Sequence, residues 1–181
     1  MPSRWEPVLH EVAGARRGRL LAFAEMLAGA NHAEDLVQEA VIATFSKRRG
    51  FDTVAQAEGY VRRAIASRYV DMVRKDSAER SRMQRTAIPE AIPDPTEGLG
   101  GDAAVDAAMA SLSPRERACV ALRYLEDLSV RDTAQTLGLS EGTVKRYVSD
   151  GLTKLNTALG THDTAESLET THVVTTDGGL R

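Results

Sequence analysis

The sequence predicts an all-α protein made of two small helical domains joined by a flexible linker, and three observations support this. Apolar residues make up 42% of the chain and aromatic residues only 4%, and the apolar positions recur at helical spacing instead of in alternating β-branched runs. Residues 86–101 hold three prolines and three glycines in sixteen positions, which is typical of a linker. Residues 129–155 have the pattern of two short helices around a tight turn.

The first domain is predicted over residues 5–82 as three helices that each carry one apolar face. The helices are expected at about 5–29, 33–48 and 57–82, with a loop over 49–56. Gly29-Ala30-Asn31 is expected to end the first of them. Together these helices are long enough to close one small core.

A linker over 83–101, a second domain over 102–160 and a disordered acidic tail over 161–181 complete the predicted organisation. The second domain is expected to contain helices at about 102–111 and 114–126, followed by the helix pair. Ser113-Pro114-Arg115-Glu116 combines a capping box with proline at the first helical position, which is a strong helix start. The tail has four acidic residues against one arginine and few large apolar groups, which favours disorder.

The helix pair at 129–155 is predicted to bind DNA as a helix-turn-helix. Ser129 and Ser140 are suited to cap the two helices, Gly138 suits a left-handed turn, and Ala134 allows close crossing. The alternative is that the polar residues of the second helix are only solvated. The residues expected to reach base edges or phosphates are Ser140, Glu141, Thr143, Lys145 and Arg146.

Two further charged surfaces are visible in the first domain. Asp35, Gln38 and Glu39 share one helical face and could pair with basic residues of a partner, although such spacing is more often an ordinary solvated face. Residues 60–85 contain eight Arg or Lys against three acidic residues, interleaved with Tyr60 and Tyr69. This basic helix fits phosphate binding and a solvated face equally well.

The remaining signals argue against other functional classes. The formal net charge is −3, and no apolar run or leader pattern predicts membrane insertion or secretion. The single cysteine, Cys119, lies on an apolar helix face and suits the reducing cytoplasm. Gly138–Gly142 matches a nucleophile-elbow string without the strand that such an elbow requires. The four histidines lack metal-ligand spacing, so no enzyme activity, catalytic residue, metal, cofactor or small-molecule substrate is predicted.

The two halves together resemble a known family. HAEDLVQEAVIATF (32–45) and GYVRRAIASRYVDMVRK (59–75) are similar to the second domain of bacterial sigma factors, and residues 112–155 are similar to the fourth. The resemblance covers about residues 15–157, in the right order. No segment resembles the first or third sigma domains, which is the layout of the extracytoplasmic-function (ECF) class of the sigma-70 family.

The resemblance implies a sigma factor that binds core RNA polymerase, directs it to a two-part promoter and helps open the DNA. Residues expected to dock on the coiled coil of the largest polymerase subunit are Asp35, Leu36, Gln38 and Glu39. Residues expected to contact the downstream promoter element are Arg62, Arg63, Ser67, Arg68, Asp71, Arg74 and Lys75. The loop at 49–56 would capture a flipped base. The helix at 140–155 would read the upstream element while its domain rests on the polymerase flap, and an anti-sigma factor is an expected regulator.

Several positions depart from the family pattern. Phe45 and Tyr60 replace usual tryptophans, Ser67 replaces a common asparagine, and Asp150 stands where an arginine is frequent. Gly151 follows and costs a helix about 1 kcal/mol relative to alanine. These changes predict an altered promoter preference or modest affinity, and a recognition helix that is weak in its last turns.

The linker predicts how the two DNA-binding elements cooperate. Counted from Asp76 to Asp102 it has 27 residues and reaches about 90 Å when stretched, whereas two promoter elements two DNA turns apart need roughly 70 Å. The isolated protein is therefore expected to bind promoter DNA weakly and to gain specificity on polymerase. The rival interpretations are an autonomous helix-turn-helix regulator that does not need polymerase, and a protein-binding adaptor whose helix-turn-helix is only a scaffold.

Overall fold

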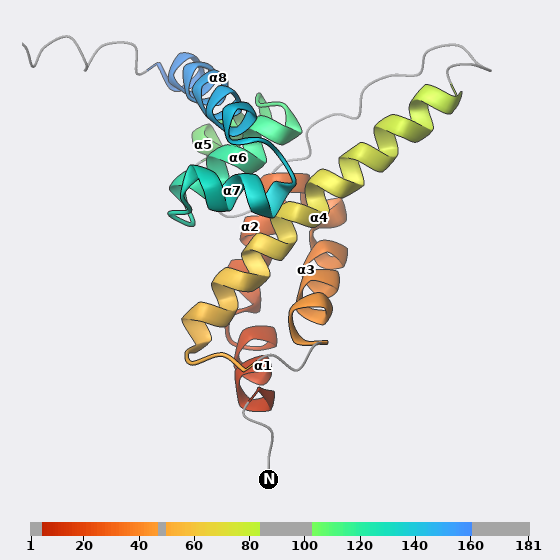
Figure 1. The fold of residues 1–181 in the computed structure, drawn as a ribbon, viewed down its shortest axis with the longest axis vertical. Coiled ribbons are helices and arrows are strands. Elements are labelled where there is room, and N and C mark those ends of the chain that lie inside the picture. Colours follow the sequence, from red (N-terminus) through yellow and green to blue (C-terminus); the bar gives the residue numbers. More distant parts are fainter. Residues whose placement is uncertain (1–4, 47–49, 84–102, 161–181) are drawn as a thin grey trace, which may run out of the picture.

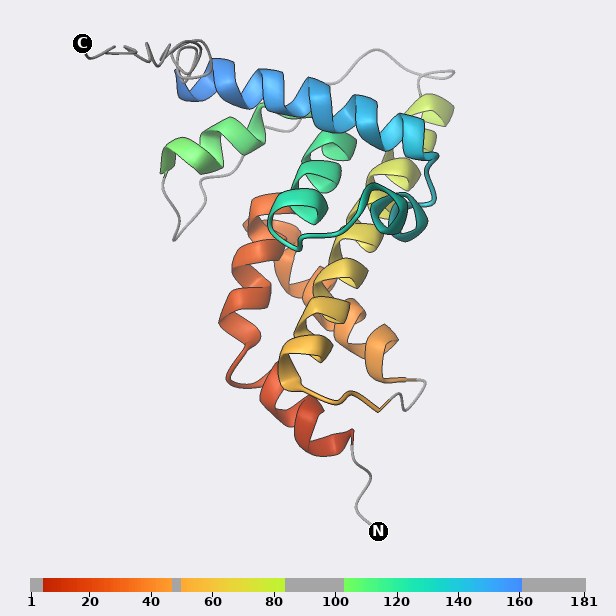
Figure 2. The same ribbon diagram turned by 60° about the vertical axis from the view of Figure 1, so that its left-hand side comes forward.

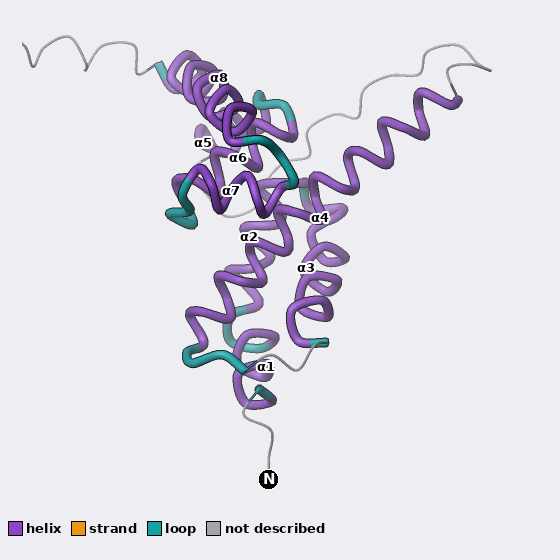
Figure 3. Tube along the Cα trace, viewed as in Figure 1, coloured by secondary structure: helices purple, strands orange, loops and turns teal. Residues whose placement is uncertain are grey.

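The computed structural model describes residues 5–46, 50–83 and 103–160, and these residues are helical apart from short turns (Figure 1). No strand occurs in these ranges, which confirms the all-α prediction (Figure 3). The predicted tail at 161–181 and nearly all of the predicted linker lie outside them. The helices are α1 (Glu6–Ala13), α2 (Arg17–Ala28), α3 (Ala30–Phe45), α4 (Val54–Met83), α5 (Ala103–Ala110), α6 (Pro114–Tyr124), α7 (Val130–Leu137) and α8 (Glu141–Leu159).

Helices α2, α3 and α4 pack side by side as the N-terminal bundle, and α1 lies against one end of it (Figures 1 and 2). Its core consists of side chains that are fully buried, among them Leu20, Leu27, Val37, Val61 and Ile65. These apolar positions recur every three or four residues in each helix, as the sequence predicted.

The single helix predicted over 5–29 is wrong, because a turn at residues 14–16 separates α1 from α2. Gly14 follows α1 with φ −101° and ψ −92°, outside helical values. A Cβ at Gly14 would lie only 2.8 Å from the His10 carbonyl oxygen, so this close return of the chain needs glycine. The apolar period continues across the turn, since Val12 and Leu20 are both fully buried, and this continuity conceals the break in the sequence.

Helix α4 covers the helix predicted over 57–82, begins three residues earlier at Val54 and ends one residue later at Met83. The linker that was counted from Asp76 therefore includes eight residues, 76–83, that belong to this helix. The segment between α4 and α5 has 19 residues, 84–102, and can span at most about 65 Å. Any separation of the two halves of the chain is limited to that reach.

The C-terminal unit consists of α5 to α8, with α8 lying across α6 (Figure 2). The predicted capping box is present: the Ser113 hydroxyl accepts from the Glu116 backbone N–H, and the Glu116 carboxylate accepts from the Ser113 N–H at 2.8 Å. The Arg117 guanidinium closes the end of α5 by donating to the carbonyls of Met109, Ala110 and Leu112.

The two units pack against each other, which the sequence did not predict. Helices α6 and α7 lie against the middle of α4, and α5 and α6 contact α2 (Figures 1 and 2). Arg117 donates across this boundary to the Leu27 carbonyl at 2.7 Å. Tyr69 of α4 is buried, and this burial raises the pKa of its hydroxyl despite the opposing effect of Arg117. The apolar residues of both units belong to one continuous core.

Candidate nucleic-acid interface

The helix-turn-helix is formed by α7 and α8 with the caps that the sequence predicted. The Ser129 hydroxyl accepts from the Asp132 N–H at 3.0 Å, and the Ser140 hydroxyl accepts from the Thr143 N–H at 3.1 Å. Gly138 ends α7 with φ 62° and ψ 39°, the left-handed conformation that glycine favours. The turn between the helices is therefore specified by local residues.

The first turns of α8 present a polar, partly basic surface. Val144 is fully buried and fixes the inner face, while Glu141, Lys145 and Arg146 are exposed. The Arg146 guanidinium lies over the ring of Tyr147, 5.2 Å from its centroid. Thr143 is half-buried, and its hydroxyl lies 2.8 Å from the Ser140 hydroxyl, so these two predicted DNA contacts are hydrogen-bonded to each other.

Gly151 has a packing role that corrects its interpretation as a weakness of α8. It is buried where α8 crosses α6, and a Cβ there would lie 2.8 Å from the Val120 Cγ2 and 3.6 Å from the Glu116 Cβ. Glycine is thus the residue that lets the two helices approach this closely. Asp150 beside it is exposed, as expected for a residue on the outer face.

Five residues of α4 form one stripe along its outer face. Their spacing of three, four, four and three residues places them on the same side of the helix. The side chains are half-buried at the beginning of α4 and become exposed toward its end. The stripe consists of Tyr60, Arg63, Ser67, Asp71 and Arg74.

The stripe carries both basic charge and a flat ring. The Arg63 guanidinium stacks over the Tyr60 ring at 5.3 Å, and Arg74 forms an ion pair with Asp71. An exposed ion pair such as Arg74–Asp71 contributes little to stability, so a phosphate can replace Asp71 as the partner of Arg74 at low cost. The stripe therefore offers a surface suited to nucleic acid.

Arg62 does not share this stripe, although the sequence grouped it with the DNA-binding arginines. Its guanidinium donates to Glu126 in the α6–α7 turn at 2.8 Å and to Glu58 at 3.1 Å. Arg16 of α2 adds a third charge, 3.4 Å from Glu58. The side chains of Arg62, Glu58 and Glu126 are only 23%, 9% and 8% exposed, so Arg62 faces the C-terminal unit instead of solvent.

An aromatic cluster lies beside the beginning of α4. The rings of Phe45 and Phe51 meet edge to face with centroids 5.4 Å apart, and Tyr60 lies 5.4 Å from Phe51. Phe45 and Tyr60 stand at the two positions where the family pattern has tryptophan. Because Phe51 is buried, the described part of the loop at 50–53 is anchored by this cluster.

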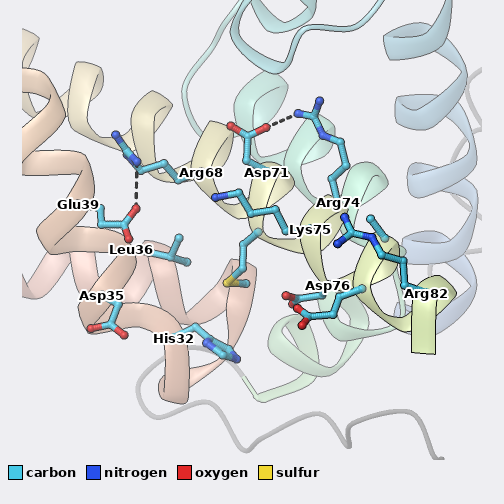
Figure 4. A pocket seen from close by; sticks show the side chains of 13 residues that line it. His32, Asp35, Leu36, Glu39, Arg68, Asp71, Arg74, Lys75, Asp76 and Arg82 are labelled. Atoms are coloured by element: carbon cyan, nitrogen blue, oxygen red, sulfur yellow. Dashed lines mark hydrogen bonds and ion pairs between the residues drawn. The ribbon is translucent and has the colours of Figure 1, made fainter. Parts of the chain in front are cut away.

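Helix α3 and the distal half of α4 border a groove of about 860 Å³ (Figure 4). Asp35 and Glu39 line it from α3, and they are exposed as predicted. Glu39 is paired with Arg68 of α4 at 3.0 Å, so the predicted acidic patch is partly neutralised within the chain. Leu36 also lines the groove but is only 5% exposed. Lys75 is exposed at the groove, and Gln38 is exposed on α3.

Two buried titratable groups support the C-terminal unit. Burial opposes ionisation of Glu116, but its hydrogen bonds with Lys154 and Ser113 outweigh that effect and lower its pKa. Lys154 of α8 lies 2.8 Å from the Glu116 carboxylate, which ties α8 to the start of α6. Cys119 is fully buried as predicted, and burial raises the pKa of its thiol to about 12.

The acidic partners of Arg62 are not among the residues that the sequence predicted. Glu58 was detectable, because Glu and Arg four residues apart on a helix form a pair. Glu126 was not, because it lies 64 residues from Arg62 and meets it only through the packing of the two units.

None of the helices in the described ranges combines the length and apolarity that a membrane span needs.

Residues 13–79 match the model for sigma-70 region 2, and residues 102–155 match the model for sigma-70 region 4. These matches correspond to the N-terminal bundle and to the C-terminal unit with its helix-turn-helix.

The proteins that this chain resembles in sequence or in fold are also sigma factors. The chain is 33% identical over 132 residues to the RNA polymerase sigma-E factor of Streptomyces antibioticus, covering 72% of each. It is 33% identical to the ECF RNA polymerase sigma factor SigE of Mycolicibacterium smegmatis, covering 92% of this chain and 66% of that one. In fold it is similar to the sigma factor RpoE of Bartonella quintana, solved with the anti-sigma factor NepR. That match has a TM-score of 0.58 at 23% identity and covers 85% of this chain and 97% of the other. This chain belongs to the ECF class of sigma-70 family RNA polymerase sigma factors, the non-enzymatic subunits that direct core polymerase to promoters.

Proposed function

We propose that this sigma factor reads the downstream promoter element with the outer stripe of α4 and the upstream element with the first turns of α8. The observation that carries the proposal is the stripe itself, since Tyr60, Arg63, Ser67, Asp71 and Arg74 lie on one face of a single long helix. The five residues extend over roughly 20 Å of helix, which is enough to follow several nucleotides. Arginines supply phosphate contacts, and Tyr60 supplies a ring for a base.

At the upstream element, α8 would enter the major groove with its capped N-terminus first. Lys145 and Arg146 are exposed and positioned for phosphate or guanine, and Glu141 can accept from a cytosine amino group. Ser140 and Thr143 would contact DNA through the hydroxyl lone pairs that the hydrogen bond between them leaves open. The buried Val144 keeps this surface at a fixed angle to α7.

Core polymerase would dock on the exposed face of α3. Asp35, Gln38 and Glu39 provide acceptors for basic residues of the coiled coil of the largest subunit, and the Glu39–Arg68 pair would exchange for that partner. Leu36 is too buried to offer much contact area, so its contribution is to hold α3 in the bundle. The C-terminal domain would rest on the flap.

Base capture would use the aromatic cluster beside residues 50–53. Phe51 and Tyr60 brace the described part of that loop, and an extruded base could stack beside Tyr60. Such a protein would act in the cytoplasm, and an anti-sigma factor of the kind found with the Bartonella relative would be its regulator.

Run-off transcription with core polymerase and a promoter library tests the assignment of the DNA contacts. Lys145→Glu with Arg146→Glu should abolish promoter-specific transcripts, and Arg63→Ala with Arg74→Ala should reduce them at least tenfold. Arg19→Ala is the matched control, because Arg19 is exposed on α2 and belongs to neither surface. Full activity of either double variant would contradict its assignment.

A pull-down with core polymerase tests the docking face separately. Asp35→Lys with Glu39→Lys should lose polymerase binding while the helical content of the chain remains unchanged. Glu11→Lys, an exposed charge reversal on α1, should bind normally. Equal binding by the α3 variant would exclude this face as the docking surface.

A further inference from the structure

The loop suggested for base capture is joined to the first turn of α4 by local hydrogen bonds. The Gln56 Oε1 accepts from the Asp52 N–H at 2.9 Å, and the Thr53 hydroxyl accepts from the Gln56 N–H at 3.1 Å. The second of these bonds caps the start of the helix. Phe51, just before them, is buried in the aromatic cluster. Residues 50–53 and the first turn of α4 therefore form one body, whose position depends on what holds this end of α4.

Helix α1 holds this end of α4. It contacts α4, and both ribbon views show it beside residues 50–53 of the loop (Figures 1 and 2). The inner face of α1 is apolar and packs against the core, with Val12 fully buried. The half-buried members of that face are Trp5, Val8 and Leu9. Arg16, in the turn after α1, adds an ion pair with Glu58 of α4 at 3.4 Å. The start of α4 is thus held by apolar packing and by a charged contact.

Helix α1 is itself unsuited to contact DNA. Its exposed carboxylates, Glu6 and Glu11, would be repelled by phosphate, and its apolar side chains face the core. Seven of its eight residues, 6–12, also precede the stretch 13–79 that matches sigma-70 region 2. An effect of α1 on promoter selection must therefore act through the residues against which it packs.

We propose that α1 is a brace that positions the base-capture loop, and that it thereby determines how strictly this sigma factor selects the extruded base. The inference rests on the proposed function, because it assigns a positioning role within the base capture suggested there. Selection of one base needs a pocket whose walls are held in place by the packing behind them. The inner face of α1 supplies that packing for the loop and for the first turn of α4.

The central test is Val12→Ala, which removes two methyl groups from the inner face of α1. Run-off transcription with core polymerase is measured on a set of promoters in which each base of the downstream element is changed singly. The wild type should prefer one base strongly at the captured position, and Val12→Ala should reduce that preference about fivefold. Preferences at the other positions and at the upstream element should stay unchanged, because the supports of the rest of α4 and of α8 are intact.

Three further variants serve as controls. Val37→Ala removes the same atoms from a fully buried position of α3, about 12 Å along that helix from Phe45. It should lower the Tm as Val12→Ala does, but it should leave every base preference unchanged. Tyr60→Leu, which removes the ring beside the extruded base, should lose the same preference as Val12→Ala. Glu11→Ala, on the exposed face of α1, should behave as the wild type.

Salt dependence separates positioning of the loop from loss of a DNA contact. Val12→Ala removes no phosphate contact, so the slope of log affinity against log salt for the polymerase complex on promoter DNA should equal that of the wild type. A changed slope would contradict a role confined to the loop. If circular dichroism melting shows that Val12→Ala does not fold, Val8→Ala with Leu9→Ala, at half-buried positions of the same face, carries the same prediction.

The outcomes separate the inference from the function on which it rests. If Tyr60→Leu relaxes the choice of one base but Val12→Ala lowers transcription from every promoter equally, the brace is wrong and base capture stands. If Val12→Ala relaxes that choice and Tyr60→Leu does not, the brace is supported and the stacking role of Tyr60 fails. If neither variant relaxes any position, base capture by the loop fails and the brace fails with it.

Discussion

Replacing Gly151 by alanine should destabilise the protein, against the usual rule for a glycine inside a helix. In an isolated helix this substitution stabilises by roughly 1 kcal/mol, because glycine loses more backbone freedom on folding. In α8, however, the new Cβ would lie 2.8 Å from the Val120 Cγ2, closer than two carbon atoms can remain. The sign of the effect therefore depends on whether α6 and α8 can separate.

The surroundings of Gly151 allow little relaxation. Val120 is only 5% exposed, and a β-branched side chain in a helix has one strongly preferred rotamer. The Glu116 Cβ lies 3.6 Å away on the other side, and Lys154 of α8 is bound to the same glutamate. Overfilling a packed core typically costs about 1–3 kcal/mol. After subtraction of the helix-propensity gain, a net loss of about 1 kcal/mol remains, which lowers the Tm by roughly 2–4 °C in a chain of this size.

Thermal melting followed by circular dichroism measures the effect, with Gly142→Ala as the matched control in the same helix. Among the described residues, and apart from its chain neighbours and its own helix backbone, a Cβ at Gly142 would meet the Ser140 hydroxyl oxygen alone, at 4.0 Å, so that substitution should raise the Tm. In a Val120→Ala background the clash is absent, and Gly151→Ala should become stabilising. If Gly151→Ala raises the Tm of the wild type as Gly142→Ala does, the close approach of α8 to α6 is not the reason for glycine at this position.

Three further predictions concern charge and burial. Although burial acts in the opposite direction, hydrogen bonds with Lys154 hold the pKa of Glu116 below its ordinary 4.5. The stabilising effect of the Glu116 carboxylate is therefore complete above about pH 4.5 and is lost as the pH falls through its pKa in the folded protein. The Tm of Glu116→Gln should therefore fall less than that of the wild type between pH 6 and pH 3. Lys145→Ala and Arg146→Ala should each reduce the slope of log affinity against log salt by about one for promoter DNA bound to the polymerase complex, and an unchanged slope would exclude a phosphate contact. Cys119 is buried with its pKa raised to about 12, so Ellman's reagent at pH 8 should react only after addition of denaturant, and immediate reaction of the folded chain would contradict its burial.

The features that the sequence predicted correctly are those determined by neighbouring residues. The caps at Ser113, Ser129 and Ser140 and the left-handed turn at Gly138 each depend on residues at most three or four positions apart. The break at Gly14 was missed because the apolar period of the core continues across it, so periodicity alone cannot separate two aligned helices from one. Local signals therefore predicted the helix-turn-helix well and the N-terminal segment less well.

Arg62 shows why a basic helix in a sequence is not one surface in the fold. Its neighbour Arg63 lies on the outer stripe, whereas Arg62, rotated by about 100° around the same helix, faces Glu126 of the other unit. The composition of the segment does not distinguish Arg62 from Arg63. The packing of α6 and α7 on α4 does. Any count of DNA-binding charges on α4 therefore depends on whether the two units are together or apart.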